Sequence, residues 1–201
     1  MHITEGVASL PVLIGGGLIS ATGVAVGLSR LTQKKIIVTA LLASSFFVTS
    51  LIHVPVAPAV SLHLLLNGLV GIILGWAAFP AIVVALLLSA LVMQHGGITV
   101  LGVNGVVMGL PAVAVYLLFG NWLKIPGRKR KIASFAAGSV AVLLTAILLV
   151  LAMVLSDKTF LSMAPVILLF HLPNMVIEGV VTMYVVGFME KVQPELLEQS
   201  V

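Results

Sequence analysis

The first two residues, Met1 and His2, hold the donor atoms with the most distinctive chemistry in this chain. The α-amine of Met1, the backbone nitrogen of His2 and the His2 imidazole can close around one metal ion as fused chelate rings. These three nitrogens lie in one plane, and a fourth would complete a square-planar site, which suits Ni(II) or Cu(II). The same pair is also typical of an ordinary frayed chain end. The rest of the sequence decides between the two interpretations.

The other strong donors are imidazoles, because the chain has five histidines and no cysteine. A metal site without thiolates has to use N or O ligands. His53 and His63 flank a proline-containing break, and each alone is typical of an interfacial side chain at a helix end. His95 precedes two glycines, which often end helices, and Asn104 lies where a helix N-cap is expected. No one of these residues indicates a metal site by itself.

The composition predicts an integral membrane protein. Hydrophobic residues make up 61% of the 201 residues and charged residues only 8%, against about 25% charged in soluble domains. The apolar runs must be helices, because they are too continuous for barrel strands and lipid leaves the backbone no other partners. The net positive charge lies in short loops beside these runs, which indicates membrane topology and not nucleic-acid binding. A cleavable signal peptide is not expected, because Glu5 lies where a basic region should be.

Seven apolar runs come close to the length of a membrane span, which needs about 20 residues. The gap between the second and third runs contains Pro55 and Pro58, which argue against a continuous helix. The last run contains Pro165 and Pro173, so it is either one kinked span or a short surface helix followed by a span from Leu172. The runs are residues 10–28, 36–52, 62–78, 81–93, 103–119, 132–155 and 160–189.

The basic residues predict the topology. If the amino terminus is outside, nine of the ten Lys and Arg residues lie in cytoplasmic loops and only Lys158 lies outside. Cytoplasmic loops carry such an excess of positive charge. The predicted fold is therefore an all-α bundle of about seven transmembrane helices, with the amino terminus outside and the carboxyl terminus in the cytoplasm. His2, His53, His63 and His95 then lie in or beside outer loops, where an ion would arrive.

Six stretches, taken in order, resemble the CbiM/NikM family. The members of this family are the substrate-binding membrane subunits of energy-coupling-factor transporters for Co(II) and Ni(II). The resemblance covers nearly the whole chain, and no single stretch would carry it. The stretches are Met1-His2-Ile3-Thr4-Glu5-Gly6, Ser50-Leu51-Ile52-His53-Val54-Pro55-Val56, Ser61-Leu62-His63-Leu64-Leu65, Asn67-Gly68-Leu69-Val70-Gly71, residues 95–104 and residues 171–179.

The resemblance implies a metal site in which the amino terminus folds back into the outer half of the bundle. Its four nitrogens are the Met1 amine, the His2 amide, the His2 imidazole and a second imidazole, at the position of His63. His53 lies only ten residues away and is an alternative ligand. His95 and Asn104 are expected to orient the ligands by hydrogen bonds, or to replace one of them. Such a planar nitrogen site excludes Mg(II) and Ca(II), which prefer oxygen ligands.

The implied organisation is one transmembrane domain. Residues 1–9 form an external metal-binding amino terminus, residues 10–189 the bundle and residues 190–201 a cytoplasmic tail. The implied function is import of Co(II), with Ni(II) as the alternative, for cobalamin biosynthesis and without a catalytic cofactor. The expected location is the cell inner membrane. The expected partners are the lipid bilayer, a transmembrane coupling subunit, paired cytoplasmic ATPases and a small accessory membrane subunit.

Two features inside the predicted spans each have two explanations. Gly17, Ala21 and Ala25 follow at four-residue spacing, which lets another helix approach closely. This row either packs inside the bundle or, as the resemblance implies, docks the coupling subunit. Glu178 is the one carboxylate inside a span, where a charge is costly. It is either a conformational or coupling residue, or a polar contact within the bundle or with a partner. Neither explanation makes it a ligand.

Two other classes of protein fit less well. An intramembrane metalloenzyme would need an acid/base partner, but the chain has no His-Glu-x-x-His sequence. A planar four-nitrogen site also leaves no easy position for a catalytic water. A light-sensing seven-helix protein would need a lysine in its last span, and residues 160–189 contain none.

Overall fold

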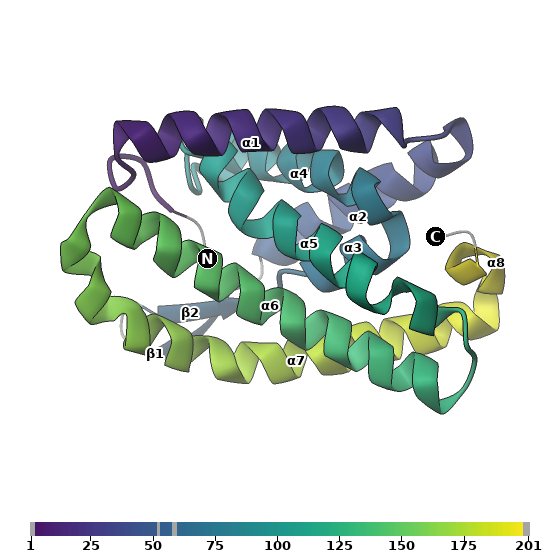
Figure 1. The fold of residues 1–201 in the computed structure, drawn as a ribbon. Coiled ribbons are helices and arrows are strands. Elements are labelled where there is room, and N and C mark those ends of the chain that lie inside the picture. The colour runs from purple at the N-terminus through teal and green to yellow at the C-terminus, as the bar shows by residue number, and fades with distance from the viewer. Residues whose placement is uncertain (1–2, 52, 58–59, 199–201) are drawn as a thin grey trace.

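The computed structural model describes residues 3–51, 53–57 and 60–198, which form an elongated bundle of helices with one short hairpin (Figure 1). Six helical segments of this described part are long and apolar enough to cross a membrane. The elements are α1 (Leu10–Ser29), α2 (Gln33–Leu51), β1 (His53–Ala57), β2 (Val60–His63), α3 (Asn67–Leu74), η1 (Gly75–Ala77), α4 (Ala78–Met93), α5 (Leu101–Leu123), α6 (Arg128–Ser156), η2 (Lys158–Met163), α7 (Ala164–Val192) and α8 (Pro194–Glu198).

The segment Asn67–Met93 reverses direction at Gly75, so it contributes to two passes. An added Cβ at Gly71 would overlap the carbonyl of Ala112, and one at Gly75 would touch Tyr116, so α3 runs in the direction of α5. The loop after α4 instead returns to the amino-terminal segment, where Gly96 accepts a hydrogen bond from Glu5. Gly75 has a φ of 60°, in the region that favours glycine. The two predicted runs 62–78 and 81–93 are therefore separate passes, and the break between them lies at Gly75, a few residues before the predicted boundary.

The third pass is only partly helical. Its helix α3 has 8 residues, about 12 Å of rise, whereas a bilayer core is about 30 Å thick. Every residue of α3 is buried in the bundle. Non-helical backbone is tolerated at membrane depth only where protein covers it, and the non-helical residues Leu65 and Leu66 are buried too. The predicted helical run from Leu62 is wrong at its start, because Leu62 lies in β2.

The proline-containing break is a β-hairpin. Strands β1 and β2 pair antiparallel, with Pro55 opposite Ser61 and His53 opposite His63. Both strands of a two-stranded sheet are edge strands. Proline is tolerated in an edge strand, because a residue whose nitrogen faces away from the partner strand does not need an N–H. Sequence analysis predicted the end of the helix correctly but not the strand pairing that follows.

The last predicted run is one helix. α7 spans Ala164–Val192 with Pro173 inside it, and Pro165 lies at its first turn, where proline is well tolerated. This confirms the single kinked span over the alternative of a surface helix followed by a span from Leu172. The preceding polar turn is completed by η2, where Asp157 accepts a hydrogen bond from the Thr159 N–H at 2.8 Å. That bond lowers the pKa of the Asp157 carboxyl.

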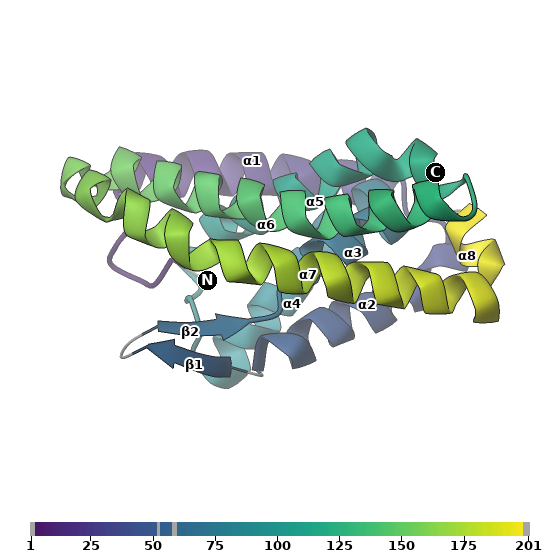
Figure 2. The ribbon, with the colours of Figure 1, turned by 90° about the horizontal axis from the view of Figure 1, so that it is seen from below.

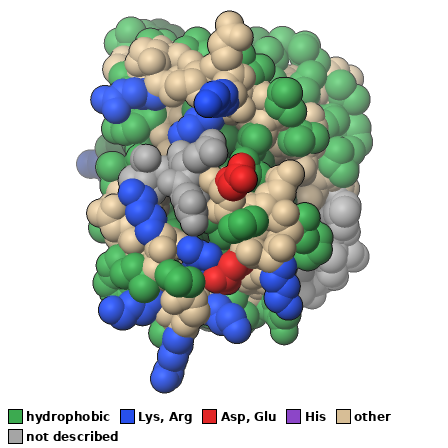
Figure 3. All heavy atoms as spheres, turned by 90° about the vertical axis from the view of Figure 1, so that its right-hand side faces the viewer, with side chains coloured by type: hydrophobic (Ala, Val, Ile, Leu, Met, Phe, Trp, Pro, Cys, Tyr) green, Lys and Arg blue, Asp and Glu red, His purple; other side chains and the backbone are tan. Residues whose placement is uncertain are grey.

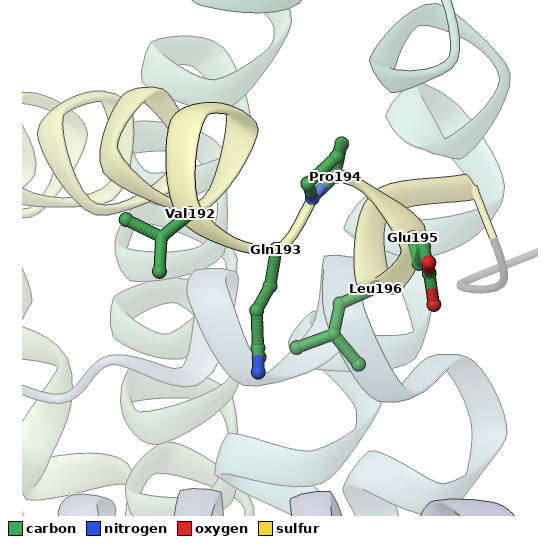
Figure 4. Close-up of a pocket in the computed structure, with 5 residues that line it drawn as sticks. All are labelled: Val192, Gln193, Pro194, Glu195 and Leu196. Carbon is green, nitrogen blue, oxygen red and sulfur yellow. The ribbon is translucent and has the colours of Figure 1, made fainter.

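The two ends of the bundle differ in chemistry. The amino-terminal segment (residues 3–9), the hairpin and the loop of residues 94–100 lie at one end, here called the hairpin end (Figures 1 and 2). Lys and Arg side chains gather at the opposite, basic end (Figure 3). There Arg130 forms an ion pair with Glu190 at 2.8 Å, and α8 folds back so that Leu197 is buried. The junction of α7 and α8 is hollowed between Val192 and Leu196 (Figure 4).

Candidate metal site

The amino-terminal segment is fixed to α5 by a pair of hydrogen bonds, here called the Ile3–Asn104 clamp. The Ile3 N–H donates to Oδ1 of Asn104 at 2.9 Å, and Nδ2 of Asn104 donates to the Ile3 carbonyl at 3.0 Å. Both residues are buried, with exposed fractions of 3% and 2%. Asn104 lies inside α5, which begins at Leu101, so the predicted N-cap role is wrong. Its amide instead holds the residue that directly follows His2.

A second attachment joins the same segment to the loop of residues 94–100. The Glu5 N–H donates to the carbonyl of Gly96 at 3.1 Å. Oε1 of Glu5 accepts the N–H and the hydroxyl of Thr99, each at 3.1 Å. These two bonds from Thr99 lower the pKa of the Glu5 carboxyl. The attachment is therefore present at neutral pH and is lost only as pH falls through this lowered pKa.

The His95-Gly96-Gly97 stretch serves this attachment. Gly97 has a φ of 129°, and an added Cβ there would overlap Cγ of Glu5, so a larger residue would block the contact. Helix α4 instead ends at Met93, and its C-cap Gln94 adopts the left-handed conformation with a φ of 56°. The helix-ending role predicted for the two glycines is therefore wrong. The side chain of His95 is partly exposed next to Gly96.

The predicted ligands are only partly within the described structure. Met1 and His2 lie outside the described residues, and the side chains of His53 and His63 are not described. The backbones of His53 and His63 are direct cross-strand partners, so the two alternative ligands occupy neighbouring positions at the hairpin end (Figure 2). Within the described side chains, no three His, Asp or Glu converge on one point.

A polar face of α7 looks into the bundle. Its members are spaced at about one helical turn and are almost fully buried: His171, Asn174, Glu178 and Thr182. Nδ1 of His171 lies 2.6 Å from the Ile167 carbonyl, so Nδ1 carries the hydrogen and Nε2 keeps a free lone pair. Nε2 of His171, Nδ2 of Asn174 and Oγ1 of Thr182 have no partner in the described structure. We missed Asn174 and Thr182 in the sequence, although polar residues at helical spacing in an apolar span signal such a face.

Glu178 forms a polar contact within the bundle, which was one of its two expected roles. Its side chain is fully buried. Oε1 accepts the N–H groups of Leu65 and Leu66, the latter at 3.1 Å, and Oε2 accepts the Leu66 N–H at 3.1 Å. These donors precede α3, which begins at Asn67. The carboxylate thus lies at the amino end of a buried helix, where negative charge is favoured.

The small residues of α1 separate into two rows. Gly23 and Gly27 meet Phe79 and Pro80 and pack inside the bundle. Ala21 and Ala25 are exposed, whereas Gly17 is partly buried, and an added Cβ at Gly102 of α5 would overlap the Gly17 backbone. The predicted docking row therefore faces outward along most of its length, and its role stays a prediction.

The six long apolar helical segments indicate a multi-pass membrane protein, and the comparisons with known proteins give its family. The family model for the cobalt uptake substrate-specific transmembrane region, CbiM, matches residues 2–196. A relative from Haemophilus influenzae, provisionally named a metal transport protein, is 37% identical over 100% of this chain and 98% of its own. The chain therefore belongs to the CbiM family, and it is a cobalt/nickel transport component.

Other relatives and solved structures agree with this assignment. The cobalt transport protein CbiM of Kyrpidia tusciae is 29% identical over 100% of this chain and 87% of its own. A provisionally named fused nickel transport protein, NikMN, of Archaeoglobus fulgidus is 28% identical over 100% of this chain and 69% of its own. The crystal structure of a transition metal transporter shares the fold, with a TM-score of 0.84 and 24% identity over 96% of this chain and 93% of that one.

The Ile3–Asn104 clamp gives a first prediction. We expect Asn104→Ala to weaken Co(II) or Ni(II) binding about 10- to 100-fold, the usual cost of removing a group that orients metal ligands. Isothermal titration calorimetry measures this change. Ser134→Ala is the control, because Ser134 is also buried but its hydroxyl donates to Arg130 at the basic end. Equal weakening in both variants would contradict the role of the clamp.

Proposed function

We propose that the chain is the substrate-binding subunit of an energy-coupling-factor transporter and that it binds Co(II), with Ni(II) as the alternative. The observation that carries this proposal is the double attachment of residues 3–5. The Ile3–Asn104 clamp and the Glu5–Thr99 bonds hold the chain directly after Met1 and His2. They do so at the end of the bundle that carries the His53–His63 strand pair.

In the proposed site the Met1 amine, the His2 amide and the His2 imidazole bind the ion together with the His63 imidazole. The amide nitrogen and both imidazoles bind in their deprotonated forms, so binding weakens as pH falls. A site made only of nitrogens selects against Mg(II) and Ca(II), whose preferred ligands are oxygens. Co(II) is named first because the family model that matches residues 2–196 describes a cobalt uptake region.

The proposed complex contains separate partners for energy supply. A transmembrane coupling subunit docks on the row of Gly17, Ala21 and Ala25, in which the two alanines are exposed. Paired cytoplasmic ATPases drive release of the ion inside. A small accessory membrane subunit completes the assembly. The amino terminus lies outside the cell inner membrane and the basic end faces the cytoplasm. The gathering of Lys and Arg at one end of the bundle supports this orientation (Figure 3).

Titration of the purified protein tests the proposal directly. The protein is produced without an amino-terminal tag, and mass spectrometry establishes that Met1 is retained and carries a free amine. We expect one Co(II) or Ni(II) ion to bind per chain, and no binding of Mg(II) or Ca(II) at the same concentrations. Calorimetry with metal analysis of the dialysed protein measures both. A protein that binds neither transition metal would refute the proposal.

A further inference from the structure

Glu178 is a buried carboxylate whose hydrogen bonds, among the residues that the structure describes, go to the backbone of Leu65 and Leu66. Its side chain is fully buried in α7, and no Lys or Arg side chain of the described residues forms an ion pair with it. Its partners are the N–H groups of Leu65 and Leu66. Both carboxylate oxygens are therefore engaged as acceptors, so Glu178 is not free to bind an ion without releasing the backbone.

Leu65 and Leu66, whose N–H groups bind Glu178, follow His63 closely in the sequence. Strand β2 ends at His63, and Leu64 alone separates it from Leu65. An extended residue spans at most about 3.6 Å, so the bound N–H of Leu65 lies within about 7 Å of His63 along the chain. A movement of the backbone at Leu65 and Leu66 would therefore displace His63 as well.

The backbone conformation of Leu66 directs its N–H toward Glu178, and the hydrogen bonds to Glu178 stabilise that conformation. Leu66 has a φ of 53°, in the left-handed region that residues other than glycine rarely adopt. Such a turn directs successive N–H groups to one side, where they form an anion-binding concavity. The Leu66 side chain does not cap α3, and Oδ1 of Asn67 accepts the Gly68 N–H at 3.0 Å. The carboxylate of Glu178 supplies the acceptor for the two preceding N–H groups, those of Leu65 and Leu66.

The other side of the turn is also fixed. Nδ2 of Asn67 donates to Oγ1 of Thr145 at 2.8 Å, and both side chains are fully buried. An added Cβ at Gly68 would meet the backbone of Ala137 and Gly138, so α3 begins in direct contact with α6. Residues 65–68 thus contact both α7 and α6. The hairpin strand that ends at His63 is therefore connected to a segment fixed on two sides.

We propose that Glu178 is a positioning residue for the fourth metal ligand. By holding the turn at Leu65 and Leu66, it sets the place and orientation of His63 before an ion arrives. This assignment rests on the proposed function, because His63 has to be a ligand for Glu178 to act through it. A rigid ligand position favours ions that demand planar geometry, so Glu178 contributes to selectivity as well as to affinity.

The test is a double-mutant cycle on metal binding. We expect Glu178→Gln to weaken Ni(II) binding about 10- to 100-fold, since an amide has a single acceptor oxygen and its NH₂ faces the backbone donors. It should also shift bound Ni(II) away from the diamagnetic, square-planar form, which visible absorption and magnetic measurements detect. In a His63→Ala background the same change should weaken binding no further, because residues that act as one unit are not additive.

Three further measurements separate this role from a general effect on folding. Thr182→Val is the matched control, because Thr182 lies one turn along α7, is fully buried and has a hydroxyl without a partner in the described structure. It should leave the affinity and the Ni(II) spectrum unchanged. Glu178→Asp keeps the charge and should bind with intermediate affinity if the Gln variant folds poorly. Cu(II), which binds nitrogen donors more tightly than Ni(II), extends the cycle to the weakest variants.

The outcomes distinguish the two proposals. Unchanged affinity and spectrum in Glu178→Gln, or equal effects with and without the His63 imidazole, would overturn the positioning role and leave the proposed function standing. Failure of the unaltered protein to bind Co(II), Ni(II) or Cu(II) would overturn both.

Discussion

Adding two residues before Met1 is expected to remove high-affinity binding of Co(II) and Ni(II), whereas a single added residue would leave a new amine, two amides and the His2 imidazole able to form a planar site without His63. The two-residue extension converts the Met1 amine into an amide and moves His2 away from the first chelate ring, so two of the four proposed nitrogens lose their geometry together. The loss should exceed that of any single-ligand substitution. Calorimetry on the extended protein beside the unextended one measures it, with mass spectrometry to identify the residue at each amino terminus.

The structure supplies the control for this experiment. The Ile3–Asn104 clamp and the bonds of Glu5 lie after the two inserted residues and remain possible. Thermal unfolding of the metal-free protein should therefore be the same with and without the extension. A residue added after Val201 should change neither stability nor binding. If the amino-terminally extended protein bound either metal as tightly as the unextended protein, the proposed ligand set would be wrong.

The second large effect is expected for His63→Ala. Removing a direct ligand should weaken Co(II) and Ni(II) binding by more than about 100-fold, the upper end of what an orienting partner contributes. The remaining three nitrogens still bind, so the affinity should fall into a measurable range. Bound Ni(II) should also lose the absorption of a four-nitrogen planar site. Titration calorimetry and visible absorption measure the two effects.

His53 provides the matched control for this substitution. It is the direct strand partner of His63, so its removal perturbs the hairpin at the same rung. We expect His53→Ala to change affinity much less than His63→Ala. The reverse order would make His53 the fourth ligand. Equal retention of binding in both variants would direct attention to His95, which lies in the loop that binds Glu5.

Most of the transmembrane architecture could be predicted from the sequence. Continuous apolar runs can only be helices in a bilayer, and the uneven distribution of Lys and Arg matches the basic end seen in Figure 3. The third pass could not be predicted. Hydropathy is the same for a helix and for extended chain that neighbouring helices cover, so the apolar run from Leu62 gave no sign of β2 or of the turn at Leu66.

Some residues around the candidate site could be singled out from the sequence, but their contacts could not, and the ligand set of Met1, His2 and His63 stays a prediction. Asn104 and the glycines after His95 were identified, yet their roles depend on Ile3 and Glu5, about 90 to 100 residues earlier in the sequence. Local propensity favoured a helix cap and a helix end, and tertiary contacts overrode both. A polar contact of the Glu178 carboxylate within the bundle was one expectation. The residues next to Glu178 in the sequence gave no sign that its partners would be Leu65 and Leu66.

The Ile3–Asn104 clamp has one more consequence, which concerns length. Asn104 bonds to the peptide N–H and carbonyl of Ile3 and to no side-chain atom of it. The clamp therefore fixes the backbone at position 3, whatever residue occupies it. The number of residues before position 3 then sets how far the amino terminus reaches. With Met1 as the proposed ligand, two residues are the required overhang. An apolar substitution at Ile3 should be tolerated, whereas trimming or lengthening the overhang by one residue changes its reach by a whole peptide unit. Maturation of the amino terminus by the cell's own processing enzymes would then decide which copies of the protein are able to take up metal.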